Sequence, residues 1–473
     1  MPKKTANQLS DGDSVHLSME TRNAWGHVAG LSILDASEAP EFCFEKLLSV
    51  IEERIKLVPR FTWKLQEVPF ALDRPYWVDC PEFDIRKHVL RIGVPSPGGL
   101  EELGELAGKL NTSPLRRNRP LWEMWYIEGV QGGKAAMFMK SHHCLMDGQA
   151  GAGLSEVLCD LAPDSTAPPL IPEAVREAHP RAPESSELTL NFLRNTIEHS
   201  RKTTGHLGGA VRNAFTSRFR AKDEFEPPAM GDAPRLFFNG AVGDRRGLAC
   251  ASLDLEEMKQ VKKHFGVTLN DVVLELVGAA LRRWLLERGE LPEAPLVAIC
   301  PISLRKEGDQ SLDNQVTTVS LSLATDVEDA DDRLRRIHLN AKRGKEVVEE
   351  DNLDFLTVMS QSLWPASINL MMRAMERTVD DVPLVGNLVV SNVRGTPVPL
   401  YTAGARIESM YPMSILQHGQ ALNLTVVSYM GKVDFGFTYE PDIVEDAWAL
   451  AAQVRPALEE LLEATRTSQG RVS

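Results

Sequence analysis

The sequence predicts an α/β protein built from two lobes. Strand-like and helix-like segments alternate over about residues 10–160 and again after residue 246. A stretch rich in Pro, Ala, Glu and Ser, residues 163–183, separates them and is typical of an exposed linker. At 473 residues the chain is too long for one ordinary hydrophobic core. We expect a first lobe over residues 1–162, a linker and crossover helix over 163–245, and a second lobe over 246–473.

The first lobe contains strand and helix candidates in alternation. Apolar runs indicate the strands, and apolar residues spaced three and four apart indicate the helices. The strands are expected at residues 28–34, 121–127 and 134–141, and the helices at residues 42–57, 100–110 and 154–161.

The second lobe shows the same patterns. The strands are expected at residues 248–253, 296–303, 316–323, 385–393, 406–410, 423–430 and 433–439. The helices are expected at residues 255–265, 268–288, 329–350, 354–376 and 443–465. Residues 296–303 form a continuous apolar run, which is typical of a strand buried on both faces.

Composition excludes several classes of protein. The net charge of −14 argues against nucleic acid as a partner, because a phosphate backbone requires a basic face. No uncharged apolar run approaches the length of a bilayer span, and the N-terminus lacks a signal-peptide core. The six cysteines show no Cys-x-x-Cys spacing, so we expect neither a zinc site nor a disulfide framework. A reduced, cytoplasmic setting is expected.

Residues 142–148, which read His-His-Cys-Leu-Met-Asp-Gly, are the most informative stretch of the chain. They follow the strand predicted at residues 134–141, and a residue just past a strand end can point into a cleft. An imidazole titrates near neutral pH, so a positioned histidine can take a proton from a hydroxyl and later return it.

This His-His-x-x-x-Asp-Gly pattern resembles the active-site motif of the bacterial wax ester synthase/diacylglycerol acyltransferase family. Further matches extend over most of the chain: residues 120–122 (Pro-Leu-Trp), 270–271 (Asn-Asp), 301–305 (Pro-Ile-Ser-Leu-Arg) and 387–395 (Asn-Leu-Val-Val-Ser-Asn-Val-Arg-Gly). Two departures are Ile302 in place of Val and a proline shifted to Pro397. The resemblance implies two chloramphenicol acetyltransferase-like lobes, each a mixed sheet flanked by helices, with the active site in a tunnel between them.

The resemblance implies that His143 is the general base. It would accept the proton of an acceptor hydroxyl as that oxygen attacks the thioester carbonyl of acyl-CoA. Because a thiol has a pKa of ~8.5, the thiolate leaves without strong acid assistance, and no covalent acyl-enzyme is required. The alternative is a buried structural histidine. His142 is expected to face the opposite way and to support the strand end.

The resemblance gives Asp147 an organising role. In related acyltransferases the matching Asp pairs with a distant Arg and holds the loop, and Arg305 matches that partner. Gly148 would allow a backbone conformation or a close approach that other residues cannot adopt.

Two other chemistries fit the motif less well. Cys144 as a nucleophile lacks support, since the family transfers acyl groups directly and a free Cys is usually a small buried hydrophobe. A metal site of His142, His143 and Asp147 is disfavoured because adjacent side chains of an extended segment diverge. We expect no metal and no cofactor, with acyl-CoA as co-substrate.

The Asn-Asp element lies at a predicted helix start, where Thr268 would be the N-cap. Asn270 would donate to the thioester oxygen or orient the acceptor, and one such donor can contribute ~3 kcal/mol. Alternatively it only caps the helix. Asp271 is expected to be structural. Ser391 and Asn392 would line the CoA channel or simply shape a strand end.

Two regions are candidates for contact with lipid. The apolar segment from Leu356 to Met375, which includes Met372, would form a tunnel wall for an alkyl chain or an ordinary helix core. A helix is also expected over residues 187–222, with apolar positions Leu207, Val211, Phe215 and Phe219. From residue 194 to residue 222 it holds seven Lys or Arg against one Glu. It would contact phospholipid or the phosphates of CoA, or pack on the domain body with a solvated basic face.

The resemblance implies an enzyme that moves a long-chain acyl group from acyl-CoA to diacylglycerol or a fatty alcohol. The products would be triacylglycerol or wax ester. One alternative is a carrier-protein-dependent condensation or polyketide-associated acyltransferase, and another is a non-catalytic lipid-droplet binding protein. We expect a peripheral location at the inner membrane face or on lipid inclusions.

Overall fold

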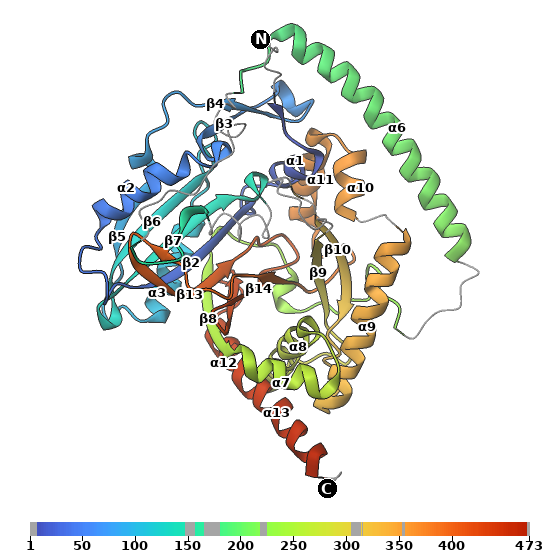
Figure 1. The fold of residues 1–473 in the computed structure, drawn as a ribbon. Helices are drawn as coiled ribbons and strands as arrows, with labels where there is room; N and C mark the ends of the chain where they lie inside the picture. The colour runs from blue at the N-terminus through green and yellow to red at the C-terminus, as the bar shows by residue number, and fades with distance from the viewer. Residues whose placement is uncertain are drawn as a thin grey trace.

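The computed structural model describes residues 7–146, 157–164, 180–217, 225–303, 314, 316–351 and 355–470. It contains two six-stranded sheets, one in each lobe, and a small three-stranded sheet of order β1-β4-β3. Figure 1 shows the blue and cyan lobe at the upper left and the second lobe below and to the right. The two-lobed mixed α/β architecture predicted from the sequence is confirmed.

The first lobe is a sheet of order β12-β13-β2-β7-β6-β5. Its strands are β2 (His27–Asp35), β5 (Val89–Gly93), β6 (Trp122–Val130), β7 (Lys134–His142), β12 (Tyr401–Thr402) and β13 (Ala405–Met413). Helices α2 (Phe44–Ile55) and α3 (Leu100–Thr112) accompany it. Helix α2 buries Leu47, Ile51 and Ile55, whose spacing of four places them on one face against the core. The strands and helices predicted in this region are confirmed, except that the helix expected over residues 154–161 lies largely outside the described residues.

Several short elements of the first lobe carried no clear sequence signal. They are β1 (Asn7–Gln8), α1 (Asp11–Ser18), β3 (Trp63–Gln66) and β4 (Tyr76–Asp79). Helix α1 begins after Ser10, whose side chain accepts a hydrogen bond from the backbone N–H of Asp13. Five of its eight residues are buried, so this short helix lies inside the molecule.

The second lobe is a sheet of order β10-β9-β11-β14-β15-β8. Its strands are β8 (Gly247–Asp254), β9 (Val297–Ser303), β10 (Val316–Ser322), β11 (Leu388–Arg394), β14 (Leu422–Tyr429) and β15 (Lys432–Tyr439). Its helices are α7 (Leu255–Phe265), α8 (Leu269–Arg288), α9 (Ala330–Asp351), α10 (Phe355–Ser362), α11 (Pro365–Thr378), α12 (Ala447–Ala452) and α13 (Val454–Gly470). Two helices predicted as continuous are each divided: α10 ends before Pro365, and α12 and α13 meet at Gln453.

Strand β13 corrects the expected division of the chain. We expected residues 246–473 to form the second lobe alone, but β13 pairs antiparallel with β2 in the first sheet, and β12 extends that sheet further. Strand β2 pairs with β7 along one edge, and its other edge is available to β13, whose alternating apolar residues suit a sheet with one buried face. The second half of the chain therefore supplies two strands to the sheet of the first lobe, which we call the strand exchange. Strand β13 also crosses β15, where Met410 N donates to Asp434 Oδ2 at 2.8 Å.

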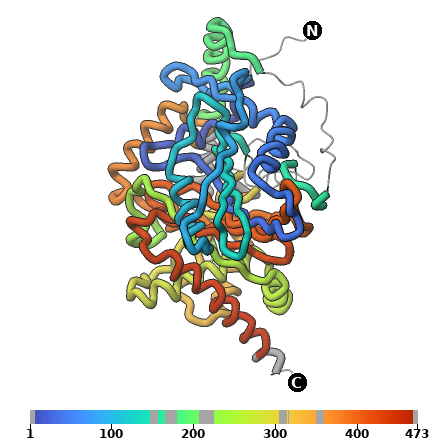
Figure 2. Tube along the Cα trace, turned by 90° about the vertical axis from the view of Figure 1, so that its left-hand side faces the viewer, coloured from blue at the N-terminus to red at the C-terminus, as the bar shows by residue number. Residues whose placement is uncertain are grey.

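Helix α6 (Ser185–Ser217) connects the lobes and agrees with the predicted crossover helix. In Figure 1 it runs along the upper right edge, and in Figure 2 it lies at the top, at the opposite end from α13. Within the described ranges, no single helix has both the length and the apolar composition to cross a membrane. Helices α7 and α8 reach that threshold only together, and they are bent by 104° relative to each other.

The crossing of β13 and β15 predicts an effect on stability. A Cβ atom at Gly436 would lie 1.8 Å from the backbone oxygen of Pro412, so Gly436→Ala must push the two strands apart. We expect the free energy of unfolding to fall by about 1–3 kcal/mol in a denaturant titration. Gly93→Ala is the matched control, because a Cβ atom there meets nothing within 4 Å. Equal stability of the two variants would contradict a tight crossing.

Candidate functional site

A cavity of about 1270 Å³ lies between the lobes and receives side chains from both sheets. Strands β2, β7 and β13 line it from the first sheet, and β9, β11 and β14 line it from the second. Because β13 belongs by sequence to the second half, the strand exchange closes one side of this space. His143 lines the cavity immediately after the end of β7.

The backbone around His143 is fixed on both sides. Its N–H donates to Gly26 O at 2.7 Å, and its carbonyl oxygen accepts from Asn314 Nδ2 at 2.8 Å. Its ring stacks on that of His16, with 4.1 Å between the centroids. Burial, with the nearby imidazoles of His143 and His142, holds the pKa of His16 well below its usual value. His16 is therefore neutral near pH 7, and it also lines the cavity.

Asp13 holds the loop that carries His143. Its fully buried carboxylate accepts from the backbone N–H and the side-chain amide of Asn314, at 3.0 and 2.7 Å. Arg60 Nη1 lies 3.5 Å from the other Asp13 oxygen and donates to Leu145 O at 3.2 Å. Carbonyl groups on both sides of Cys144 are thus tied to this carboxylate. Sequence reasoning did not single out Asp13, and the Ser10 cap was the one local signal near it.

His142 lies on the opposite side of the strand end, as its alternation with His143 predicted. Its Nε2 donates to Glu20 Oε1 at 3.0 Å, and its Nδ1 accepts from Cys144 N at 3.1 Å. Glu20 also accepts from Gly26 N and from Arg117. Burial alone would raise the pKa of Glu20, but the ring of His142 and the guanidinium of Arg117 bring that pKa well below its usual value. An ionised Glu20 therefore fixes the His142 ring beneath the site.

Cys144 lies fully buried in the core of the first lobe. Burial, with the nearby carboxylates of Asp13 and Glu20, raises the pKa of its thiol well above the usual value. A thiolate nucleophile is disfavoured at this position, because the thiolate and not the thiol is reactive.

The Asn-Asp element forms the start of α8. Thr268 is the N-cap, and Asp271 accepts from Thr268 N at 2.8 Å and from His338 Nδ1 at 2.7 Å. Asn270 accepts from Asn392 Nδ2 at 3.3 Å, which brings the two predicted site elements together. Asn392 lines the cavity, and Asn270 is not one of its lining residues. This geometry makes Asp271 a capping residue and Asn270 a partner of Asn392.

The other predicted residues divide into two groups. Ser391 and Met372 line the cavity. The side chain of Leu356 and the whole of Asp147, Gly148 and Arg305 lie outside the described residues, so the expected pairing of Asp147 with Arg305 stays a prediction.

Methionine dominates the apolar lining. Twelve of the fifteen methionines of the chain contribute to the cavity, from Met137 and Met139 on β7 to Met371, Met372 and Met375 on α11. Methionine is unbranched and adapts its shape to a hydrocarbon. The cavity is therefore suited to long apolar chains passing the His143 ring.

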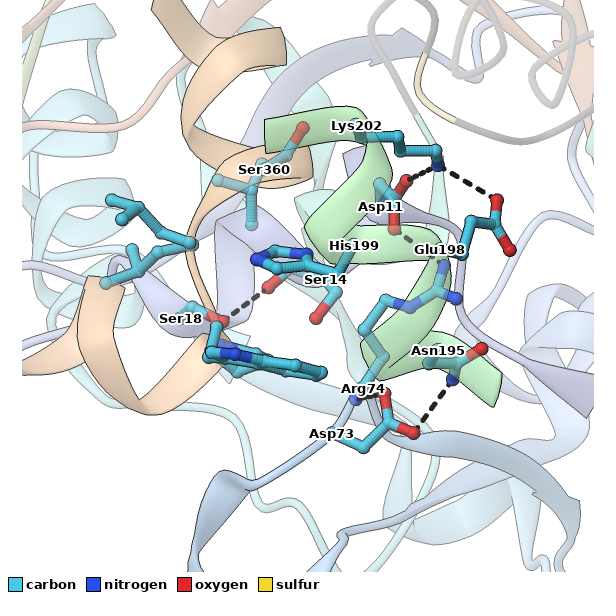
Figure 3. A pocket seen from close by; sticks show the side chains of 15 residues that line it. Asp11, Ser14, Ser18, Asp73, Arg74, Asn195, Glu198, His199, Lys202 and Ser360 are labelled. Carbon is cyan, nitrogen blue, oxygen red and sulfur yellow. Dashed lines mark hydrogen bonds and ion pairs between the residues drawn. The ribbon is translucent and has the colours of Figure 1, made fainter. Parts of the chain in front are cut away.

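A second, smaller hollow lies where α6 meets the first lobe (Figure 3). Lys202 Nζ lies 2.9 Å from an Asp11 oxygen, and Arg74 lies 2.8 Å from the other. The ring of His199 stacks on Trp364 with 4.5 Å between centroids. These contacts attach α6 to the body, and a volume of about 30 Å³ leaves no room for a substrate.

Comparison with known proteins identifies a family over nearly the whole chain. The family model described as the wax ester synthase/diacylglycerol acyltransferase catalytic domain matches residues 9–273, and the WS/DGAT C-terminal domain matches residues 312–462. A Mycobacterium tuberculosis protein named as a diacylglycerol O-acyltransferase is 35% identical, covering 96% of this chain and 90% of its own. A second M. tuberculosis protein with that name is 33% identical, covering 96% and 99%.

Solved structures agree with this match. The wax ester synthase/diacylglycerol acyltransferase from Marinobacter aquaeolei VT8 is similar over 97% of this chain and 100% of its own, with a TM-score of 0.70 and 26% identity. The first condensation domain of the calcium-dependent antibiotic synthetase is similar in fold, with a TM-score of 0.56 and 14% identity over 97% and 96% of the chains.

Glu20 and Glu67 both bind Arg117, but we expect their removal to have different effects on stability and activity. Glu20→Ala leaves His142 Nε2 and Gly26 N without their acceptor, so we expect a loss of about 1–3 kcal/mol in stability. Activity should fall as well, since Gly26 O positions His143. Glu67→Ala removes only the exposed partner of Arg117 and should cost under about 1 kcal/mol. Chemical denaturation and turnover of both variants check this, and similar losses would refute a special role for Glu20.

Proposed function

Because the chain belongs to the wax ester synthase/diacylglycerol acyltransferase family, we propose that its O-acyltransferase reaction proceeds at His143 inside the cavity between the lobes. Its substrates are an acyl-CoA and an acceptor alcohol. The acceptors that fit the family are diacylglycerol and long-chain alcohols, which would give triacylglycerol and wax ester. The observation that carries the proposal is the position of His143 on the wall of a methionine-rich cavity shared by both lobes.

The proposed reaction needs one base. His143 takes the proton of the acceptor hydroxyl as that oxygen forms a bond to the thioester carbonyl carbon. The carbon–sulfur bond then breaks, and the proton passes from the imidazolium of His143 to the departing CoA thiolate. His16 supports this cycle because its neutral ring lies against that of His143 and fixes the plane of the imidazole. The proposal requires no covalent acyl-enzyme, metal or cofactor.

The Asp13 and Glu20 networks supply preorganisation. Each fixes a different part of the backbone next to His143: Asp13 acts through Asn314, and Glu20 acts through His142 and Gly26. Because His143 is already in position when the alcohol binds, no free energy is needed to reorganise it, and this lowers the barrier of the reaction.

The first test replaces the base. We expect His143→Ala to lower kcat/KM by about 10²–10⁴-fold, the usual contribution of a positioned general base. The assay follows CoA release from palmitoyl-CoA with diolein or hexadecanol as acceptor. Cys144→Ala is the neighbouring control and should keep turnover within about threefold of the wild type, because its buried thiol plays no part in the reaction. An unimpaired His143→Ala enzyme, or an acyl group trapped on Cys144, would overturn the mechanism.

We further propose that α6 contacts an anionic lipid surface. Its inner side packs on the body through Asn191, Asn195 and Lys202. Its outer side exposes Leu190, Leu193 and Ile197, with exposed fractions of 67%, 55% and 74%. The sequence left docking on the body and lipid contact as alternatives, and the two faces of α6 allow both. Arg194 and Arg201 are also exposed, which fits anionic headgroups, and the proposed acceptors are themselves lipids.

Vesicle sedimentation tests this contact. Burial of one leucine contributes about 1.5–3 kcal/mol, so the double variant Leu190→Asp, Ile197→Asp should bind anionic phospholipid vesicles at least about tenfold more weakly. Leu286→Asp is the control, because Leu286 is 52% exposed on α8, away from α6. Unchanged binding of the double variant would contradict the contact.

A further inference from the structure

A shallow trough runs along β2 on the cavity side of the first sheet. In the antiparallel registers, Gly30 lies between Met139 on β7 and Pro412 on β13, and Ser32 lies between Met137 and Met410. Directly opposed residues of neighbouring strands share a face. All six residues line the cavity. The two small residues form the floor, and the larger neighbours form its walls.

The trough leads away from His143. Side chains alternate along a strand, so Met137, Met139 and His143 lie on the same side of β7 and its extension. Met139, the partner of Gly30, lies four residues before His143. At a rise of about 3.3 Å per residue, Gly30 therefore lies about 13 Å from His143 along the strand. Beyond Ser32 the same row continues to Ile407, which is buried and also lines the cavity. The space therefore extends along the sheet from the base to a buried end.

The path is open above Gly30. A Cβ atom built there meets no other atom within 4 Å, and its φ is not in the left-handed region. The backbone does not require glycine at this position, and the fold does not fill the space above it. A strand glycine normally weakens a strand, so its presence over open space points to a group that approaches closely.

We infer that Gly30 sets the length of hydrocarbon chain that the enzyme accepts. The straight alkyl chain of one substrate lies in the trough, with its reacting end at His143, and a long chain must pass over Gly30. This inference rests on the proposed function in that the cavity is taken as the substrate path. The group in the trough is an unbranched hydrocarbon chain, which belongs either to the acyl donor or to the acceptor.

The test inserts a side chain at Gly30. Gly30→Val suits a strand and narrows the trough, and the Cβ atom that it adds meets no other protein atom within 4 Å. Gly30→Ala narrows the trough less. Gly93→Val is the matched control, because Gly93 is also a strand glycine with open space above it but lies outside the cavity. Thermal unfolding checks that each variant is folded.

Two chain-length profiles are measured by CoA release. One varies the donor from butyryl- to palmitoyl-CoA, and the other varies the acceptor from butanol to hexadecanol. We expect Gly30→Val to lower kcat/KM for the longest member of one profile by at least about tenfold, since a misfit methylene in an apolar pocket has that effect. Its shortest members should be unaffected, Gly30→Ala should show a smaller shift, and Gly93→Val none. The profile that shifts identifies the chain in the trough.

Equilibrium binding of palmitoyl-CoA and of hexadecanol gives a readout independent of turnover. Gly30→Val should weaken one of the two at least about tenfold. Equal changes at all chain lengths, or none, in the folded variants would overturn the inference. A wild type that releases no CoA with any alcohol would instead count against the proposed function, and the binding measurements would still decide the role of Gly30.

Discussion

The pairing of β13 with β2 is the constraint on which the site depends. It carries a strand from the second half of the chain into the first sheet, and it places Met410 and Pro412 beside the small residues of β2. The same strand crosses β15, so the sheets cannot slide past each other without breaking the contact at Asp434. Strand β13 thus forms one side of the cavity. The path beside His143 therefore depends on the two lobes keeping their relative positions.

Two carboxylates, the buried Asp13 and the partly buried Glu20, hold the backbone around His143 in place. Asp13 draws Asn314 of the second half onto the carbonyl oxygen of His143, and Glu20 fixes His142 and Gly26 below it. Isolated buried charges are costly, and these are tolerated because each accepts several hydrogen bonds. The loop is therefore held from the backbone, which leaves the ring of His143 to face the cavity and the ring of His16.

Local patterns predicted most of the architecture. Apolar periodicity located the main strands and the crossover helix, and the run of residues 142–148 placed His143 at a strand end. Periodicity cannot say which edge a strand will join, so the transfer of β13 to the first sheet was missed. Asp13, His16 and Glu20 were missed for a related reason. Their partners lie far along the chain, and helix α1, which holds Asp13 and His16 and ends just before Glu20, has almost no amphipathic pattern.

The methionine lining also has a chemical consequence. A thioether takes up oxygen from peroxides to form a sulfoxide, which converts a flexible apolar side chain into a polar, chiral one. With twelve sulfur atoms along a single passage, oxidants reaching its interior would wet a surface that is otherwise matched to hydrocarbon. Oxidation of these side chains would therefore remove the apolar character and the flexibility on which the proposed path for an alkyl chain depends.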